Sequence, residues 1–319
     1  MSEETPRPHC WAISEDAAGM RAQAQGLAEA AGFSFEIKLL HAHGFWRRLP
    51  PQWWPRPLSV IRPTLTPPWP DVAIGCGSKA AAVLAAIAPY TKVVMVQHPR
   101  MNPARFSLVV VARHDRLTGP NVLVGRTALH RATRERLAAE AEVWRPRFAA
   151  LRRPLVAVLV GGSNNRYRLD AGVAENLARQ LVGMMAADGV SVAVTPSRRT
   201  DAAAREILRR EIEAAGGYVW DMQGENPYFG ILALADAVVV TEDSVSMVSE
   251  AVSTSAPVLL ARLPGKSRRI GQFTAGLIAD GRVREFHGRF ETWDAQPMDD
   301  TPAIAAEMCR RLGYAPPAG

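Results

Sequence analysis

Short runs of apolar residues alternate with segments of helical periodicity along most of this chain. The pattern is clearest in the second half, where the apolar run 237–240 precedes a polar stretch at 241–244. Apolar residues then recur at helical spacing from Val245, and Pro257 ends that helix before the apolar run 258–260. A strand, loop, helix and strand in this order predict part of a parallel sheet. Ligands of such sheets bind at the loops that follow the strands.

The same alternation covers both halves of the chain. Strands are predicted at residues 9–13, 34–40, 71–75, 92–97, 107–112, 121–124, 155–160, 190–194, 218–221, 237–240 and 258–260. Helices are predicted at about residues 20–31, 79–88, 133–144, 171–187, 201–215 and 301–312. Two further helices are predicted, one that begins at Val245 and another that ends at Ala279. We therefore predict an α/β fold with two facing, doubly wound, Rossmann-like domains at residues 1–148 and 149–319. The last helix is a candidate to pack back on the first domain.

One segment departs from the alternation. Residues 50–70 hold eight prolines, and residues 46–69 hold four of the eight tryptophans. Proline at this density excludes one continuous helix or a central strand and predicts an irregular loop. The tryptophans either pack against the domain or form an exposed lip. Together with Arg47, Arg48 and Arg56, an exposed lip would suit a partner or an anionic membrane surface.

Composition narrows the class of protein. A chain of 319 residues with 48% hydrophobic content can form two cores. No apolar run reaches the roughly 18 to 20 residues that span a bilayer, and the amino terminus has the pattern of neither a signal nor a transit peptide. Three scattered cysteines (Cys10, Cys76 and Cys309) form no CxxC pair and suggest a reducing compartment. We expect a cytoplasmic protein, with peripheral attachment to the inner membrane as a further possibility.

The net charge of +7 favours anionic partners, although an arginine-rich composition alone gives the same value. Nucleic acid is an unlikely partner, because no basic run is interleaved with aromatic residues. Metal ions are also not expected. His114 and Asp115 have no third ligand at suitable spacing.

Polar loops after the predicted strands of the second half carry the candidate ligand contacts. Glycines after residue 160 would let backbone N–H groups approach a phosphate, and arginines would add charge. Glu250 would accept hydrogen bonds from ribose hydroxyls. Each feature also has a plain structural interpretation as a tight turn, a helix cap or a solvated glutamate. The candidate donor-binding residues are Gly161, Gly162, Ser163, Asn164, Arg166, Ser197, Arg198, Asp243, Ser244, Ser246 and Glu250.

The first half of the chain has one candidate anion-binding turn and one candidate acid/base pair. A glycine turn at 75–79 begins a helix and could cradle an anion, but it lacks the full dinucleotide fingerprint. His114 and Asp115 follow a predicted strand at the edge expected to face the ligand. They are candidates for an acid/base or orienting pair, while a structural histidine is equally compatible with the sequence.

These motifs resemble known families. The Gly-Gly-Ser loop, residues 236–240, Ser244, Glu250 and residues 256–259 are similar to the donor half of GT-B glycosyltransferases, above all those that add N-acetylglucosamine to the lipid intermediate of peptidoglycan. That resemblance implies a UDP-sugar whose ribose is held by Glu250 and whose diphosphate lies near Gly161, Gly162 and Ser163, with no metal and no DxD motif. Met20 stands where a histidine is expected, which leaves Asp16 as the candidate general base. No clear match exists for the glutamines that contact the donor sugar.

A second resemblance covers almost the whole chain. Its segments are Trp11, 16–19, 25–27, 96–100, 113–115, 160–163, 195–200, 226–228 and 241–244. Together they resemble the "elongated mitochondria" fission family, whose plant member is an adaptor for a dynamin-related protein and whose bacterial members are GT-B-like.

Two hypotheses follow. In the first, the protein is a metal-independent GT-B glycosyltransferase. It uses no cofactor, takes a nucleotide-sugar such as a UDP-sugar as donor, and acts on a lipid-linked or membrane-proximal acceptor. In the second, it is a non-catalytic adaptor that retains the nucleotide-binding cleft. A nucleotide-sugar epimerase or other short-chain dehydrogenase is disfavoured, because GxGxxG and a Tyr followed four residues later by Lys are both missing.

Overall fold

The computed structural model describes residues 7–317, which form two compact units. Unit 1 contains the residues up to Arg131 and those from Asp299 onward, and unit 2 contains Ala132–Met298. The chain thus enters unit 2 before α3 (Arg134–Trp144) and not at the predicted boundary of 148/149. The reason is packing: Trp144 is buried in the core of unit 2.

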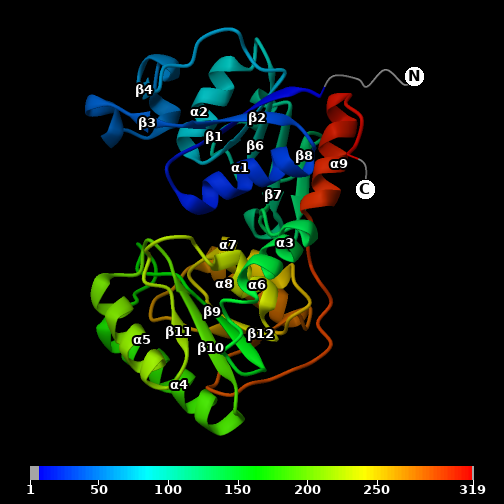
Figure 1. Cartoon of the computed structure of the whole chain (residues 1–319). Coiled ribbons are helices and arrows are strands. Elements are labelled where there is room, and N and C mark those ends of the chain that lie inside the picture. Colours follow the sequence, from blue (N-terminus) through cyan, green and yellow to red (C-terminus); the bar gives the residue numbers. More distant parts are fainter. Residues whose placement is uncertain (1–6, 318–319) are drawn as a thin grey trace. The chain divides into compact units, whose positions relative to one another are not determined.

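Unit 1 is built on a six-stranded parallel sheet of order β2-β1-β5-β6-β7-β8. Its strands are β1 (His9–Ser14), β2 (Ser34–Leu39), β5 (Val72–Cys76), β6 (Lys92–Val96), β7 (Leu108–Ala112) and β8 (Val122–Gly125). Its α-helices are α1 (Ala18–Ala30), α2 (Ser78–Ile87) and α9 (Thr301–Leu312). In Figure 1 the C-terminal helix α9, in red, lies beside α1.

Alternate residues of β1 show how this sheet is covered on both faces. Cys10 and Ala12 pack into the core that α1 and α9 cover. Trp11 and Ile13 pack into the opposite core, which α2 and the proline-rich segment cover. Successive strand residues point to opposite faces, so a strand buried on both sides is continuously apolar.

The proline-rich segment is irregular but not unstructured. Counted from His41, where its first paired strand begins, the segment contains the short 3-10 helices η1 (Gly44–Arg48), η2 (Pro51–Trp53) and η3 (Pro57–Ser59). It also contains the antiparallel pair β3 (His41–Ala42) and β4 (Ile61–Arg62). Both interpretations of its tryptophans hold in part. Trp54 is buried in the core, whereas Trp53 is 68% exposed and Phe45 is 64% exposed.

Unit 2 repeats the arrangement with a parallel sheet of order β11-β10-β9-β12-β13-β14. Its strands are β9 (Leu155–Val160), β10 (Ser191–Pro196), β11 (Tyr218–Val219), β12 (Ala237–Thr241), β13 (Val258–Ala261) and β14 (Val283–Glu285). Besides α3, its helices are α4 (Ala171–Asp188), α5 (Ala202–Ala214), α6 (Tyr228–Leu234), α7 (Val245–Val252) and α8 (Arg268–Ala279). Helices α4 and α5 cover one face, and α3, α6 and α7 cover the other (Figure 1).

The predicted α/β class with two doubly wound domains is confirmed. One edge strand was not predicted: β14 has only three residues, Val-Arg-Glu, and so carries no apolar run. Among the described helices, none combines the length and apolar character needed to cross a membrane.

Candidate functional site

The candidate donor site lies at the carboxyl edge of the unit 2 sheet. The strand order reverses between β9 and β12, because the chain passes outward from β9 through β10 to β11 and then returns to β12 on the other side. Open α/β sheets bind ligands at such a reversal, where the loops leave in opposite directions. The loops after β9, β10 and β12 therefore define the site.

The two glycines after β9 use their N–H groups within the protein. Gly161 N donates to Thr241 Oγ1 at 2.8 Å, and Gly162 N donates to Asp243 Oδ2 at 3.1 Å. A Cβ on Gly161 would lie 2.2 Å from Asp243 Oδ1, and one on Gly162 would lie 2.2 Å from the Arg199 carbonyl group. Close packing therefore explains the requirement for glycine at these two positions.

The next residues of the loop fold it locally. Ser163 Oγ accepts a hydrogen bond from Leu169 N at 2.9 Å. Asn164 Oδ1 accepts hydrogen bonds from Arg166 N at 2.8 Å and from Tyr167 N at 3.0 Å. These side chains hold the shape of the loop, while Arg166 itself is exposed.

The loop after β10 packs on the first glycine. Ser197 Oγ donates to the Gly161 carbonyl oxygen at 2.8 Å and accepts from Arg199 N at 3.2 Å. Thr200 Oγ1 donates to the same carbonyl. Arg198, the predicted ligand contact of this loop, is exposed beside them.

Asp243 connects the three loops. Its side chain is fully buried and accepts hydrogen bonds from Gly162 N, from Thr241 Oγ1 at 2.7 Å and from Arg199 Nη2 at 2.7 Å. A buried carboxylate is stable only with such partners, because its desolvation costs several kcal/mol. Arg199 and Thr241 lie in polar loops that the sequence pointed to, but they are not among the predicted donor-binding residues, since local sequence does not distinguish Arg199 from Arg198.

Helix α7 carries the remaining predicted contacts. Ser244 caps it by accepting from Met247 N at 3.4 Å, and Ser246 lies half-buried in its first turn. Glu250 is only 6% exposed, and its carboxylate accepts a hydrogen bond from the Tyr228 hydroxyl. Burial and the neighbouring Glu250 charge together raise the pKa of Tyr228 well above its ordinary value, so this phenol remains a donor at physiological pH.

The three candidate catalytic residues belong to unit 1, but the fold does not bring them to one place. Asp16 is exposed and follows β1, whereas His114 and Asp115 lie in η5 (Arg113–Asp115) after β7. Strands β5 and β6 separate β1 from β7, so the two loops are roughly 14 Å apart at about 4.8 Å per strand. His114 Nε2 lies 3.9 Å from Asp115 Oδ1, and both side chains are buried.

The glycine turn before α2 already holds an anionic group. Glu15 accepts hydrogen bonds from Ser78 Oγ at 3.2 Å, Lys79 N at 3.3 Å and Lys79 Nζ at 2.5 Å. Burial opposes ionisation of Glu15, but the Lys79 contacts outweigh it and hold the pKa of Glu15 below its usual range. The carboxylate of Glu15 thus occupies the place that the sequence suggested for an anion.

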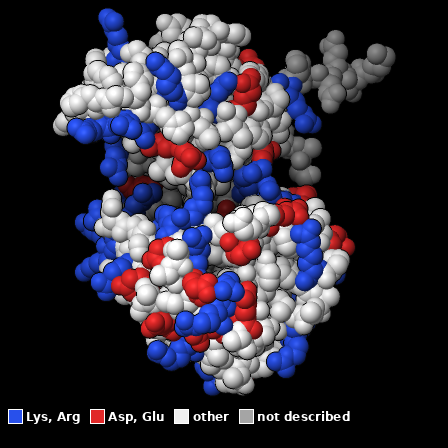
Figure 2. Space-filling view, turned by 60° about the vertical axis from the view of Figure 1, so that its left-hand side comes forward, with Lys and Arg blue, Asp and Glu red and all other residues white. Residues whose placement is uncertain are grey.

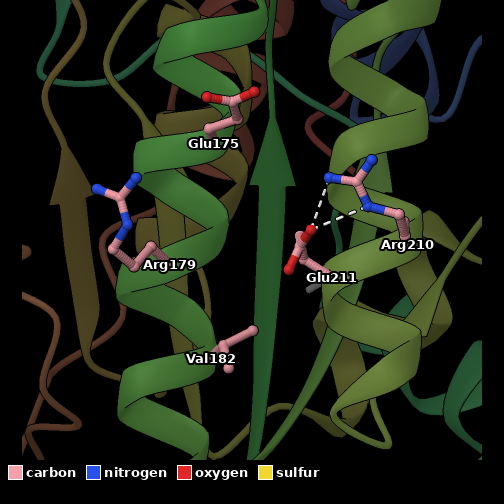
Figure 3. Close-up of a pocket in the computed structure, with 5 residues that line it drawn as sticks. All are labelled: Glu175, Arg179, Val182, Arg210 and Glu211. Atoms are coloured by element: carbon pink, nitrogen blue, oxygen red, sulfur yellow. Dashed lines mark hydrogen bonds and ion pairs between the residues drawn. The ribbon is translucent and has the colours of Figure 1, made fainter.

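Two surface features lie apart from these loops. Arg179 of α4 and Arg210 of α5 border a shallow groove whose other lining residues are Glu175, Val182 and Glu211 (Figure 3). None of these five is a predicted site residue. Basic side chains are spread over both units with acidic ones between them (Figure 2), so the net charge by itself does not locate a site. Within residues 7–317, no group of three or more His, Cys, Asp or Glu side chains is arranged to hold a metal ion.

The family of this chain follows from its similarity to known proteins. The model of the mitochondrial fission ELM1 family matches residues 18–312. This chain belongs to that family. The mitochondrial fission protein ELM1 of Arabidopsis thaliana is 32% identical to it over 286 residues, covering 80% of this chain and 67% of the plant protein. The Rickettsia prowazekii protein RP120 is 26% identical over 157 residues, covering 47% of this chain and 44% of that protein.

Solved structures show that the ELM1 family chain has a GT-B-like fold. The UDP-GlcNAc 2-epimerase of Methanocaldococcus jannaschii aligns with a TM-score of 0.59 at 11% identity over 96% of this chain and all of its own. Staphylococcus aureus MnaA, solved with UDP, gives 0.55 at 10% identity and 98% coverage of both chains. The spinosyn forosaminyltransferase SpnP gives 0.53 at 12% identity, covering 98% of this chain and 96% of its own. At these identities the likeness concerns the fold alone.

Proposed function

We propose that this protein binds a nucleotide-sugar in unit 2 and transfers the sugar to an acceptor, with the acceptor side on unit 1. The observation that carries the proposal is the buried Glu250 carboxylate on α7, the helix that follows β12 at the reversal of the unit 2 strand order. A carboxylate in this position can accept both ribose hydroxyls of a nucleotide. A uridine nucleotide is the first donor to test, because two proteins of similar fold are a UDP-GlcNAc 2-epimerase and MnaA, which was solved with UDP.

The remaining candidates take separate roles in this proposal. Arg166 and Arg198 are exposed in loops of the site and supply positive charge for the donor. Ser246, in the first turn of α7, is proposed as a further donor contact. Asp16, exposed at the carboxyl end of β1, is the proposed general base that removes a proton from the acceptor hydroxyl. His114 and Asp115 are proposed as an orienting pair, because they are too far from Asp16 to act on the same proton. The proposed transfer uses no cofactor and no metal ion.

A scaffold without chemistry is the second candidate. Two observations favour it: the Gly161 and Gly162 amides are already satisfied within the protein, and the Arabidopsis relative is named as a fission protein. An epimerase reaction is a further outcome to test. The lack of GxGxxG argues only against the dehydrogenase type of epimerase, whereas the solved neighbours include epimerases of the GT-B fold.

We also propose that the acceptor side contacts an anionic membrane surface. In unit 1 the exposed rings of Phe45 and Trp53 share the proline-rich segment with exposed Arg47, Arg48 and Arg56. Aromatic rings insert at a lipid interface and arginines bind anionic headgroups. Vesicles containing phosphatidylserine should sediment the protein more strongly than phosphatidylcholine vesicles do, and Trp53→Ser should reduce that difference. Val143→Ser, at an exposed valine of unit 2, is the control, and an equal effect of both variants would refute the assignment.

Nucleotide binding tests the main proposal. Thermal shift and calorimetry would compare UDP, GDP, ADP, CMP and their common sugar conjugates on the wild type and on Glu250→Gln, which keeps an acceptor for Tyr228. A ligand at one hundred times its Kd stabilises the native state by about 2.7 kcal/mol, or roughly 5–10 °C in Tm. We expect one nucleotide to give this shift and the variant to lose it. If no nucleotide shifts the wild type, the transferase is excluded and the scaffold remains.

A nucleotide that binds then allows the reaction to be identified. Conversion of the sugar without an acceptor would indicate an epimerase, whereas release of the nucleoside diphosphate only with an acceptor would indicate a transferase. Asp16→Asn should lower the transfer rate by about 10² to 10⁴ and leave nucleotide affinity unchanged, because Asp16 lies outside unit 2.

A further inference from the structure

A site for a nucleotide-sugar needs a group that binds the diphosphate. The group predicted from the sequence, the glycine N–H groups after β9, already donates hydrogen bonds within the protein. The N–H groups of Gly161 and Gly162 point to Thr241 and Asp243 of their own unit. A diphosphate could reach these amides only by displacing the Thr241 hydroxyl and the Asp243 carboxylate, and that carboxylate is fully buried and held by several donors. Another group at the same edge of the sheet must therefore bind the phosphates.

Arg199 has the geometry for that role. Its Nη2 donates to Asp243 Oδ2 at 2.7 Å, and its Nη1 donates to the Gly162 carbonyl oxygen at 3.1 Å. These two bonds fix the guanidinium in one orientation, yet the side chain is still 40% exposed. A guanidinium has five N–H donors, so a side chain held in this way retains donors for a ligand.

The position of Arg199 also fits. It belongs to the loop after β10, which packs on the loop after β9 at the reversal of strand order. An arginine held before the ligand arrives loses little side-chain entropy on binding, and its planar fork matches two phosphate oxygens at once.

We propose that Arg199, held by Asp243, is the phosphate-binding residue of unit 2 and takes the place of the Gly-Gly amides. Asp243 is then a positioning residue that acts through Arg199. This inference rests on the proposed nucleotide-sugar function and names the group that recognises its diphosphate.

The test separates phosphate recognition from recognition of the nucleoside. Calorimetry would measure UDP, uridine and inorganic pyrophosphate binding to the wild type and to Arg199→Gln. We expect the variant to bind UDP and pyrophosphate about 10- to 100-fold more weakly and uridine unchanged, as for loss of hydrogen bonds to a charged group. Arg210→Gln is the matched control, because Arg210 is a surface arginine of the same unit that also pairs with a carboxylate, Glu211, at 2.7 Å. It should leave all three affinities unchanged.

Each outcome decides between the two proposals. If UDP and uridine weaken by the same factor in Arg199→Gln, or if neither changes, Arg199 is structural and the inference fails while nucleotide binding stands. If pyrophosphate binds through Arg199 but no nucleotide binds, the inference stands and the proposed function fails. If the wild type binds none of the three probes, the inference fails together with a uridine-nucleotide donor.

A second variant guards against loss of folding. Arg199→Gln leaves the Asp243 charge buried without its cation, which can destabilise the protein by several kcal/mol. The double variant Arg199→Gln/Asp243→Asn removes both charges and keeps amide groups of similar shape. It should fold, bind uridine as the wild type does, and bind UDP as weakly as the single variant. Binding of UDP at wild-type strength by the folded double variant would overturn the inference.

Discussion

Tyr228 and Glu250 illustrate how a single hydrogen bond prepares a site. Their contact joins the start of α6 to α7 and leaves the carboxylate buried with a phenol as donor. Because burial and Glu250 raise the pKa of Tyr228, the phenol does not ionise in competition with the carboxylate. No sequence pattern pairs Tyr228 with Glu250, although residues 226–228 are among the segments of the family resemblance.

At the scale of residues, Tyr228→Phe isolates this bond. The variant keeps the ring, including its edge contact with Phe229, and removes only the donor. We expect the free energy of unfolding to fall by about 1–3 kcal/mol, because a buried charged acceptor loses its partner. Urea denaturation measures this change.

A double-mutant cycle with Glu250→Gln assigns the effect to the pair. The two losses should be clearly non-additive if the hydroxyl acts through Glu250. Tyr218→Phe, at another tyrosine packed against the same core, is the control and should change stability by less. Additive losses would show that Tyr228 stabilises the unit in some other way.

At the scale of elements, the end of α7 depends on Arg282. This buried side chain follows α8, and its guanidinium donates to the carbonyl oxygens of Val252 at 3.2 Å, Thr254 at 2.7 Å and Ala256 at 3.1 Å. Helix carbonyls at a C-terminus lack partners within the helix, so a cation there satisfies them. Burial lowers the pKa of Arg282 to about 10, which leaves it charged at neutral pH.

Loss of Arg282 should therefore loosen the helix that carries Glu250. We expect Arg282→Met to reduce the free energy of unfolding by about 3–5 kcal/mol, because several buried carbonyls lose their donor at once. Arg282→Lys should recover part of this loss. Chemical denaturation of both variants gives the values.

Arg284 provides a matched control two residues further on. It is an exposed arginine that pairs with Glu291 at 3.0 Å and lies over the Trp293 ring. Surface ion pairs contribute at most about 1 kcal/mol, so Arg284→Met should have a small effect. Equal losses in the two methionine variants would contradict the role of Arg282 as the cap of α7.

At the scale of the whole molecule, unit 1 is completed by the end of the chain. Asp300 binds Arg126 through Nε at 3.1 Å and Nη2 at 2.8 Å and accepts from Thr127 N at 3.2 Å. Next to this contact, buried His130 lies 3.3 Å from Asp299. Charged and polar contacts thus hold residues 126–130, where the chain leaves unit 1, against residues 299–300, where it returns.

His130 makes the stability of this closure depend on pH. Burial lowers the pKa of His130, although Asp299 and Asp300 partly oppose the shift. The unfolded chain, with an ordinary histidine pKa of about 6.5, then binds more protons than the native state as the pH falls. The stabilisation is fully present above about pH 6.5 and is lost as the pH falls below it toward the folded pKa. We expect urea unfolding to show this decline as the pH falls below about 6.5 in the wild type and a flatter profile in His130→Gln.

Titration of Asp300 affects the free energy of unfolding in a lower pH range than titration of His130, so the two contributions can be told apart. Burial raises and the Arg126 contacts lower the pKa of Asp300, with a net shift below its usual value. Its contribution is therefore present above about pH 3.8 and is lost only at lower pH. A decline that begins near pH 6.5, well above the range of Asp300, and persists in His130→Gln would refute the assignment to His130.

The amino-acid sequence determined the architecture of both units. Runs such as residues 155–160 and 237–240 are apolar throughout, and alternating helices with one apolar face leave few arrangements other than doubly wound parallel sheets. The loops that matter also followed from the sequence, because ligands of such sheets bind where strands end. Glu250, Asp243 and the Gly-Gly pair were found in this way.

Only the tertiary structure decided what these loop residues do. Asp243 meets Arg199 across 44 residues of chain and Gly162 across 81, and Tyr228 meets Glu250 across 22. Such contacts depend on which strands become neighbours and on how closely their loops pack, and neither is written in local periodicity. The glycine N–H groups predicted to cradle a phosphate donate instead to the Thr241 hydroxyl and to the buried Asp243 carboxylate. Arg199 has the geometry to replace them, and the sequence could not choose it over the neighbouring Arg198, because tertiary packing determines which guanidinium is held in place at the site.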